Sequence, residues 1–469
     1  MILLRLIATN FSWLLLHMKE KNFIVNGALL LGIGTLIAKI LGAVYRIILT
    51  NQIGALGLGL YQMVFPVYTL LLDFSGAGLP SALSRLISGF EQDKDNKAKR
   101  LLKNSIKLFS IFGLFASLFM ALFSFKIAKF QGNTNASLAY LFLSPAIFFV
   151  AIISCFRGYF QGYMNMVPTS VSQIIEQIIK LFAGFLLIRF FLPNIPLCVG
   201  GATLAITFSE LITLIYLIIL YRNKNKKLRF EGADSRDSFV LDSKKIISNT
   251  LPITLVGIMI PLSQVVDSFL TINIISKYSS NATTLYGLLS GACMSVINLP
   301  VSLCYGIATV AIPAISSVKD EKLKQNRSKK VITITVLIAL PCSLLLTLFS
   351  PLVIKILFNR LSLSEKVVAI KLLKLTSPCV IFLSVLQASN AILIGKGKLY
   401  TPVITLLIGI IVKTVLNLIL LNVQKINIYG GAISIIACYF TTCLINLILI
   451  FAKRVRNESI RVKGGQYAN

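Results

Sequence analysis

The stretch RNKNKKLRFEGADSRDSFVLDSKK (residues 222–245) is the longest polar connection inside a chain that is otherwise mostly apolar. Hydrophobic residues make up 56% of the 469 residues, and the mean hydropathy is +0.84. Charged residues contribute 13%, whereas a soluble domain carries about 25%. We therefore predict an all-α polytopic membrane protein, which this connection divides into two halves.

Apolar windows of about 20 residues, the length that an α-helix needs to cross a membrane, lie on both sides of this connection. They predict about twelve transmembrane helices, near residues 23–49, 60–89, 104–125, 136–156, 167–191, 196–221, 246–275, 284–315, 331–357, 367–394, 399–421 and 429–452. The predicted domains are a six-helix N-lobe (23–221) and a six-helix C-lobe (246–452). A leader or cytoplasmic N-terminus (1–22) precedes them, and a basic tail (453–469) follows. We interpret the first part of the leader as an upstream-start extension or an interfacial segment rather than a signal peptide.

The formal net charge of +30 comes largely from connections between the apolar runs. Lysine and arginine gather in every second connection, at residues 94–107, 222–245, 319–330 and 396–398, and again in the tail. By the positive-inside rule, this alternation predicts that both termini lie in the cytoplasm, beneath a bacterial inner membrane. The same basic residues would contact anionic lipids. We interpret the charge in this way and do not predict nucleic-acid binding.

The sequence offers little for metal, redox or nucleotide chemistry. The eight cysteines lie mostly in apolar runs and include no CxxC pair, and the only histidine, His17, lies in the leader. A G-x-x-x-x-G-K-[ST] phosphate loop is absent from the sequence. We therefore predict a transporter without a metal or cofactor, not an enzyme.

Charged side chains nevertheless lie within the predicted spans. They are Lys39, Arg46, Asp73, Glu176, Lys180, Glu210, Asp267 and Lys413. An ionisable group at membrane depth costs roughly 2.5 to 3.5 kcal/mol even on the translocon scale. Several such groups in one chain predict a polar interior that a charged or strongly polar substrate crosses.

Two pairs of these residues share a helix. Lys39 and Arg46 are two helical turns apart on one face of the first span. An ammonium beside a guanidinium suits a phosphate or pyrophosphate; alternatively, Lys39 snorkels and Arg46 marks the membrane boundary. Glu176 and Lys180, at positions i and i+4, either neutralise each other or face the cavity.

The remaining charges admit two roles each. Asp267 is predicted either to bind a coupling ion, H⁺ or Na⁺, or to pair with a base in the cavity. Asp73 and Glu210 fit the same two roles. Lys413 is either a partner for one of these carboxylates or the second-half equivalent of Lys180.

Two internal similarities relate the halves. Residues 78–88 align without gaps with residues 306–316. Residues 157–162 followed by Pro168 resemble residues 390–395 followed by Pro402. These similarities predict two six-helix bundles related by an axis along the membrane normal. Ligand sites in such transporters lie near the middle of the membrane, between the repeats.

The run RGYFQGYMNMVPTSVSQIIEQ (residues 157–177) resembles the signature of the stage V sporulation protein B and polysaccharide-exporter branch of the MOP flippase superfamily, which is related to the lipid II flippases and to the MATE transporters. Further matches support the resemblance. They are KILG (39–42) with Arg46, IGA (53–55) before GLY (59–61), GAGLP (76–80) with Ser84 and Arg85, YG (286–287), and GKGK (395–398) before Pro402.

This resemblance implies two bundles around a V-shaped central cavity. It also implies a flippase that moves peptidoglycan or polysaccharide precursors on undecaprenyl pyrophosphate by alternating access, with a role in spore cortex synthesis. Lipid II flippases commonly have further terminal spans and an Arg-Asp pair in the first helix, where this chain has Tyr45 and Arg46. The implied substrate is therefore the wider class of glycans and muropeptides on this carrier.

The predicted site combines the charges within the spans with the arginines of the family-like motifs. The predicted cavity residues are Lys39, Arg46, Asp73, Arg85, Arg157, Glu176, Lys180 and Lys413, and the predicted ion-coupling residues are Asp267 and Glu210. The alternative function is an ion-coupled multidrug antiporter. Such a protein would share the architecture, but its cationic substrates would favour carboxylates over bases in the cavity.

Overall fold

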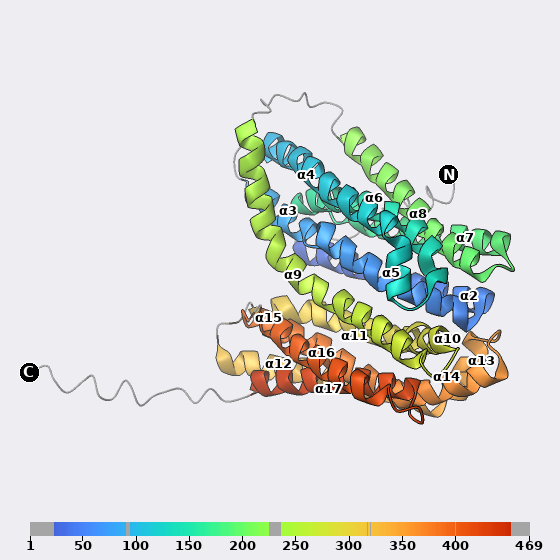
Figure 1. Ribbon diagram of the computed structural model, residues 1–469. Coiled ribbons are helices and arrows are strands. Elements are labelled where there is room, and N and C mark those ends of the chain that lie inside the picture. The colour runs from blue at the N-terminus through green and yellow to red at the C-terminus, as the bar shows by residue number, and fades with distance from the viewer. Residues whose placement is uncertain are drawn as a thin grey trace, which may run out of the picture.

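The computed structural model describes residues 23–90, 94–224, 236–316, 318, 320–398 and 400–451, and these residues are almost entirely helical (Figure 1). The predicted leader, the middle of the basic connection and the basic tail lie outside the described residues. The first half contains α2 (Phe23–Leu72), η2 (Asp73–Ala77), α3 (Leu79–Ser88), α4 (Lys94–Leu122), α5 (Ser124–Phe130), η3 (Thr134–Ala136), α6 (Ser137–Gly162), α7 (Val167–Phe191) and α8 (Ile195–Lys224).

The second half begins with a helix of 40 residues, α9 (Arg236–Ile275). It continues with α10 (Ala282–Tyr286), η4 (Gly287–Cys293), α11 (Met294–Ser316), α12 (Glu321–Leu348), α13 (Ser350–Leu357), α14 (Leu363–Thr376), α15 (Cys379–Gly395), α16 (Thr401–Leu420) and α17 (Ile428–Phe451). Figure 1 shows α3 to α8 packed as one group and α11 to α17 as another, with α9 running from the first group to the second.

The first part of α9 belongs to the segment that we predicted as a linker, yet it packs on the first half. Asp242 accepts hydrogen bonds from Arg100 Nε at 3.1 Å and from Asn104 Nδ2 at 2.8 Å, both on α4. The second part of α9 packs against α16 and α17. One continuous helix therefore connects the two groups.

In the described part of the chain, nine helices are long and apolar enough to cross a membrane, or ten if the bent pair α14 and α15 is one span. The first of them, Gly34–Ser88, has 55 residues, which as a straight helix would be about 80 Å long, against a hydrocarbon core of about 30 Å. It includes two predicted spans, because the backbone breaks at Gly54, where φ is 66°. The set of nine does not include α7. The membrane-spanning all-α class is confirmed, and the count of about twelve stays a prediction.

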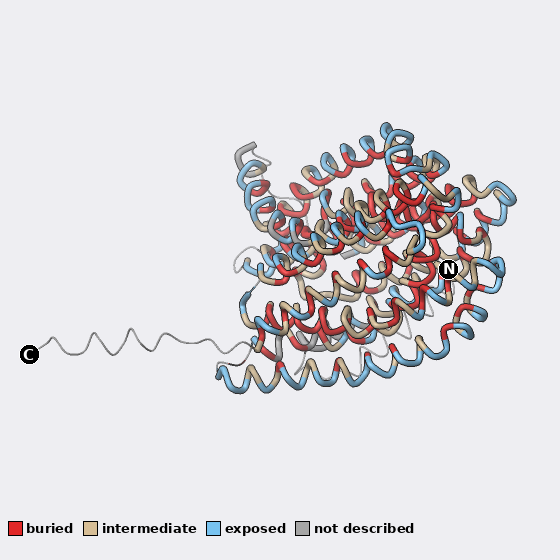
Figure 2. Tube along the Cα trace, turned by 60° about the horizontal axis from the view of Figure 1, so that its bottom comes forward, coloured by how far each residue is buried: buried red, intermediate tan, exposed pale blue. Residues whose placement is uncertain are grey.

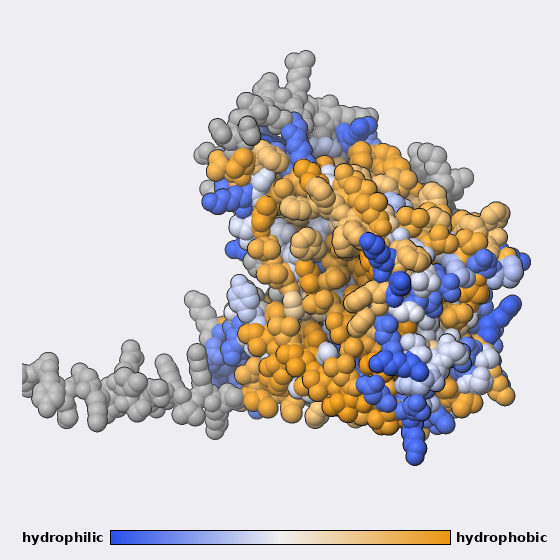
Figure 3. Space-filling model, in the orientation of Figure 1, coloured by the Kyte–Doolittle hydropathy of each residue, from blue (hydrophilic) through white to orange (hydrophobic). Residues whose placement is uncertain are grey.

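The surface has the character of a membrane protein. Apolar side chains cover the broad middle of the face in Figure 3, and hydrophilic residues gather toward the ends of the helices. Large hydrophobic residues such as Phe115 and Leu186 are exposed. In Figure 2 the buried residues lie where helices face one another and the exposed residues lie on the outside. Such an exposed apolar surface is expected of helices that face lipid.

The two halves meet closely at the end that the charge pattern places outside the cell. Asn51 Nδ2 donates to the carbonyl of Leu357 at 2.7 Å, and Asn133 Nδ2 donates to Thr283 Oγ1 at 2.9 Å. At Gly59 the backbones approach so closely that a Cβ atom would collide with the carbonyl of Thr283. The structure is therefore closed at this end.

The predicted orientation can be tested with single cysteines on either side of α7. We expect a membrane-impermeant maleimide to label Asn194→Cys in intact cells, because this residue follows α7 at the predicted outer surface. Asn165→Cys, which precedes α7, should react only after the membrane is permeabilised. The parent chain controls for its own cysteines, seven of which are buried. Equal labelling of both positions in intact cells would contradict the predicted crossing.

Candidate functional site

Two adjoining cavities lie among the described helices. The first, of about 470 Å³, lies among α2, α6, α7, α11 and α15; we call it the basic cavity, and its charged lining residues are Lys39, Arg46, Arg157, Glu176 and Lys180. The second, of about 390 Å³, lies mainly among α9, α11, α15, α16 and α17; we call it the amide cavity, after its carboxamides Gln62, Gln264, Asn298, Gln387 and Asn390. The linings share Arg46, Phe65, Asn298 and Gln387, so the cavities meet at these residues.

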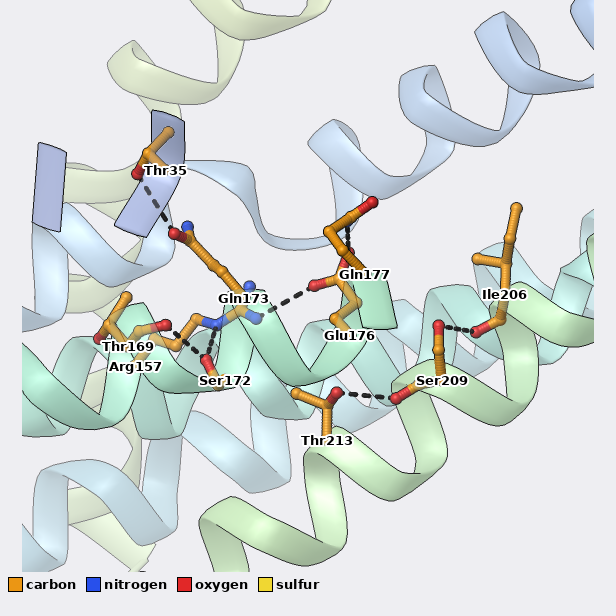
Figure 4. Close-up of polar contacts among 10 residues, drawn as sticks. All are labelled: Thr35, Arg157, Thr169, Ser172, Gln173, Glu176, Gln177, Ile206, Ser209 and Thr213. Carbon is orange, nitrogen blue, oxygen red and sulfur yellow. Dashed lines mark hydrogen bonds and ion pairs between the residues drawn. The ribbon is translucent and has the colours of Figure 1, made fainter. Parts of the chain in front are cut away.

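The motif that begins at Arg157 builds one wall of the basic cavity. Arg157 lies in the last two turns of α6, and α7 starts directly after a short turn, with Pro168 in its first turn. Proline suits this position, because the first N–H groups of a helix have no partner within the helix. The short turn brings the side chain of Arg157 back against the second and third turns of α7 (Figure 4).

Arg157 is held by two side chains of α7. Its Nη2 forms an ion pair with Glu176 Oε2 at 3.2 Å, and its Nε donates to Ser172 Oγ at 3.0 Å. Gln177 Nε2 donates to the other carboxylate oxygen of Glu176 at 2.9 Å. Glu176 therefore bonds to Arg157 of the neighbouring helix, so the partner is not its predicted intrahelical neighbour, Lys180.

Lys180 lies beside this pair and close to a second carboxyl group. Its Nζ is 5.5 Å from the ring centroid of Tyr45, whose hydroxyl donates to the carbonyl of Ala202 at 3.2 Å. Glu210 of α8 is 4% exposed, lies next to Glu176, and has one carboxylate oxygen without a hydrogen-bond partner among the described residues. The interior of the first half thus places two bases beside two carboxyl groups.

Lys39 and Arg46 differ from these residues because aromatic rings and a hydroxyl are their partners. Lys39 Nζ lies 3.8 Å from the ring centroid of Tyr305, and the Arg46 guanidinium carbon lies 5.7 Å from that of Phe65. Arg46 Nη1 also donates to Ser295 Oγ at 3.4 Å. Cation–π contacts contribute roughly 0.5 to 2 kcal/mol and bring no negative charge. The predicted common face of Lys39 and Arg46 therefore presents positive charge to the basic cavity.

In the second half, Asp267 is in direct contact with a base of the cavity, and its predicted role in binding a coupling ion stays a prediction. Lys413 Nζ lies 2.6 Å from Asp267 Oδ2 and donates to Ser263 Oγ at 2.5 Å. Asn417 Nδ2 donates to the other oxygen of Asp267 at 3.1 Å. Asp267 thus pairs with a cavity base, and this pair adds no net charge to the amide cavity.

Three predicted residues lie outside the linings of both cavities. Glu210 is behind Glu176, as described above. Asp73 starts η2 beside α9, where a Cβ atom on Gly257 would lie 3.7 Å from its Oδ2. Arg85 is exposed on α3. The roles assigned to these residues stay predictions.

Comparison with known proteins identifies the family to which this chain belongs. The family model described as polysaccharide biosynthesis protein matches residues 24–319. The chain belongs to this family. A second model, MatE, matches residues 244–419. The predicted superfamily is thereby confirmed.

The family's curated relatives include two proteins of Bacillus subtilis (strain 168). Lipid II flippase MurJ is 28% identical over 91% of this chain and 82% of its own length. Stage V sporulation protein B is 25% identical over 94% of this chain and 86% of its own length.

Solved structures show the same fold. Lipid II flippase MurJ in an inward closed conformation gives a TM-score of 0.71 at 17% identity, covering 90% of this chain and 87% of that one. An inward-facing MATE multidrug transporter gives a TM-score of 0.70 at 16% identity, covering 91% and 96%. The fold is therefore MATE- and MurJ-like, and this family member is a membrane transport protein and not an enzyme.

Several lining residues were not predicted from the sequence. Gln173 accepts a hydrogen bond from Thr35 Oγ1 at 3.2 Å and so joins α7 to α2 (Figure 4). Asn298 and Gln387 line both cavities. All three are amides inside apolar runs, which is a signal that the sequence does contain. Ionisable side chains alone do not reveal these positions.

The ion pair between Arg157 and Glu176 predicts a stability effect. Their side chains are 14% and 19% exposed, and removing one partner of such a pair leaves a buried charge uncompensated. We expect Arg157→Ala to destabilise the protein by about 3 kcal/mol. The double variant Arg157→Ala/Glu176→Gln should recover part of the loss, because the stranded carboxylate is gone. Thermal unfolding of the purified protein in detergent measures both effects.

Arg189→Ala is the matched control for this experiment. Arg189 is an exposed arginine in the last turn of α7 and lines neither cavity, so its loss should leave the melting temperature nearly unchanged. The single variant Glu176→Gln completes the comparison. If the double variant loses as much stability as the two single variants together, the two side chains do not stabilise each other.

Proposed function

We propose that this chain is a flippase that moves the headgroup of a lipid-linked precursor, carried on undecaprenyl pyrophosphate, across the bacterial cytoplasmic membrane. The observation that carries the proposal is the pair Lys39 and Arg46. Both line one cavity between the halves, and both contact aromatic rings where a neutralising carboxylate would otherwise be expected.

The chemistry of the basic cavity fits a pyrophosphate. The guanidinium of Arg46 can bind two phosphate oxygens at once, and Lys39 adds a mobile point charge two turns away. A cavity of about 470 Å³ lies in the usual size range of small-ligand sites. The polyprenyl chain has no need to enter the cavity, because it is soluble in the surrounding lipid.

The same contacts suggest how binding is linked to alternating access. Lys39 and Arg46 belong to α2, whereas their partners Tyr305 and Ser295 belong to α11 of the second half. A pyrophosphate that draws Lys39 and Arg46 to itself would compete with these contacts between the halves. Binding would thereby favour a different arrangement of the two groups of helices, with the site open to the outside.

The relatives support this class of substrate. One is named a lipid II flippase and another a stage V sporulation protein. We extend the proposal to a precursor of peptidoglycan or of a polysaccharide, with spore cortex synthesis as the process served. Both termini are proposed to lie in the cytoplasm, where the basic connections would contact anionic lipids.

Ion-coupled multidrug antiport fits the site less well. A cationic substrate needs carboxylates free to receive it, but Asp267 is paired with Lys413, and Glu176 is paired with Arg157. Our candidates for coupling to H⁺ or Na⁺ are Asp267 and Glu210; one carboxylate oxygen of Glu210 has no hydrogen-bond partner among the described residues. If a proton gradient drives flipping, Glu210→Gln should abolish the dependence of flipping on that gradient, and an unchanged dependence would exclude this role.

Substitution of Arg46 tests the proposal. Arg46→Ala should lower flipping at least tenfold, while Arg46→Lys should retain an intermediate rate, because lysine keeps the charge and loses the two-pronged contact. The measurement is the amount of undecaprenyl-linked precursor on each membrane face in cells depleted of the native protein and supplied with each variant.

Arg189→Ala serves here as a basic residue outside both cavities and should support normal flipping. Depletion alone should raise the precursor on the inner face. Full activity of both Arg46 variants would contradict a substrate-binding role for this residue. Unchanged precursor distribution after depletion, in a strain without a second flippase, would contradict the proposed function itself.

A further inference from the structure

The amide cavity is polar but carries little net charge of its own. The ion pair between Asp267 and Lys413 cancels, and the remaining charged lining residue, Arg46, is shared with the basic cavity. The other polar groups of the lining are carboxamides, serine hydroxyls and the two tyrosines Tyr286 and Tyr439. Carboxamides both donate and accept hydrogen bonds, so this lining matches a neutral ligand that is rich in hydroxyl and amide groups.

Gln387 lies where the two cavities meet, and its side-chain oxygen lacks a hydrogen-bond donor among the described residues. It lines both cavities, and its Oε1 is buried without a hydrogen-bond partner among the described residues. A buried acceptor in this state lowers stability until a donor reaches it. A sugar hydroxyl or an acetamido N–H would be such a donor once the side chain turns its oxygen toward a cavity.

Asn390 is oriented by a hydrogen bond from Asn446, which does not line the amide cavity. Its Oδ1 accepts from Asn446 Nδ2 at 2.8 Å, and Thr405 Oγ1 in turn donates to Asn446 Oδ1 at 2.8 Å. With the oxygen of Asn390 bonded in this way, its Nδ2 is the donor that it offers to the amide cavity. The side chain is thus oriented before any ligand arrives.

The internal repeat gives the two cavities corresponding positions with different chemistry. Arg157 lies near the end of α6, and Asn390 lies near the end of α15; each helix is followed by one with proline in its first turn, α7 and α16. Arg157 lines the basic cavity and Asn390 lines the amide cavity. The same place in the fold therefore presents a guanidinium in one half and a carboxamide in the other.

We infer that the amide cavity binds the glycan of the lipid-linked substrate while the basic cavity binds its pyrophosphate, and that Gln387 and Asn390 help to select the glycan. The inference rests on the proposed function, because it divides one substrate between two adjoining cavities. It assigns the neutral and the anionic part of the headgroup to separate, adjoining cavities.

The test compares two kinds of ligand on the purified full-length chain. Undecaprenyl pyrophosphate alone reports the pyrophosphate site, and the same carrier bearing N-acetylglucosamine or the lipid II headgroup reports the glycan site as well. We expect the native chain to bind at least one glycosylated carrier more tightly than the bare carrier. Asn390→Leu should lose about tenfold in affinity for that glycosylated carrier, the usual effect of one buried hydrogen bond. It should bind the bare carrier within about twofold of the native value, because Asn390 lines the amide cavity and not the basic cavity.

Gln52→Met is the matched control, because Gln52 also has a buried Oε1 that finds no partner in the described part of the chain, but it lines neither cavity. It should bind every ligand as the native chain does. Gln387→Met should also lose affinity for the glycosylated carrier, but its binding of the bare carrier is not a control, because Gln387 lines both cavities. If either cavity variant binds the glycosylated carrier as well as the native chain does, or if glycosylation adds no affinity in the native chain, the inference is overturned. Failure of the proposed function gives a different result: the bare carrier would not bind, or would bind equally well to Arg46→Ala.

Discussion

The structure depends on how each charge at membrane depth finds a partner. An unpaired charge there is costly, and each half contains one ion pair that offsets part of that cost. Arg157 and Glu176 join α6 to α7, and Lys413 and Asp267 join α16 to α9. Because these pairs connect different helices of the same half, they stabilise each half without joining the halves. The contacts between the halves are made by other groups, among them Asn51 with the carbonyl of Leu357 and Arg46 with Ser295.

The charges left over determine the chemistry of the interior. Lys39 and Arg46 lie between the halves and contact Tyr305, Phe65 and Ser295, none of which carries a negative charge. Their positive charge is therefore available to an anionic ligand, whereas the Asp267 pair leaves the adjoining amide cavity close to neutral. A headgroup with a pyrophosphate at one end and a sugar at the other has the same division of charge. The contrast between the two cavities, and not the total charge of the chain, is the basis for proposing a lipid-linked glycan as the substrate.

Much of this arrangement could be predicted from the sequence, because it depends on periodicity along a helix. The apolar windows predicted the membrane-spanning all-α class, and the two-turn spacing of Lys39 and Arg46 predicted their common face. Contacts between helices could not be predicted in the same way. Glu176 of α7 forms its ion pair with Arg157 of the preceding helix, α6, and not with Lys180 of its own helix. Which of the two bases it contacts depends on how α7 is rotated against α6. The carboxamides of the amide cavity come from several helices, so only the folded chain shows that they meet.

The most direct test of the account is transport by the purified chain in lipid vesicles that contain undecaprenyl pyrophosphate bearing N-acetylglucosamine or the lipid II headgroup. An impermeant labelling enzyme outside the vesicles reports how much headgroup becomes accessible over time. The account predicts that the native chain exposes headgroup beyond the share already in the outer leaflet, and that Lys39→Ala/Arg46→Ala exposes only that share. Equal exposure by the native chain and the double variant would contradict the claim that these two bases carry the pyrophosphate.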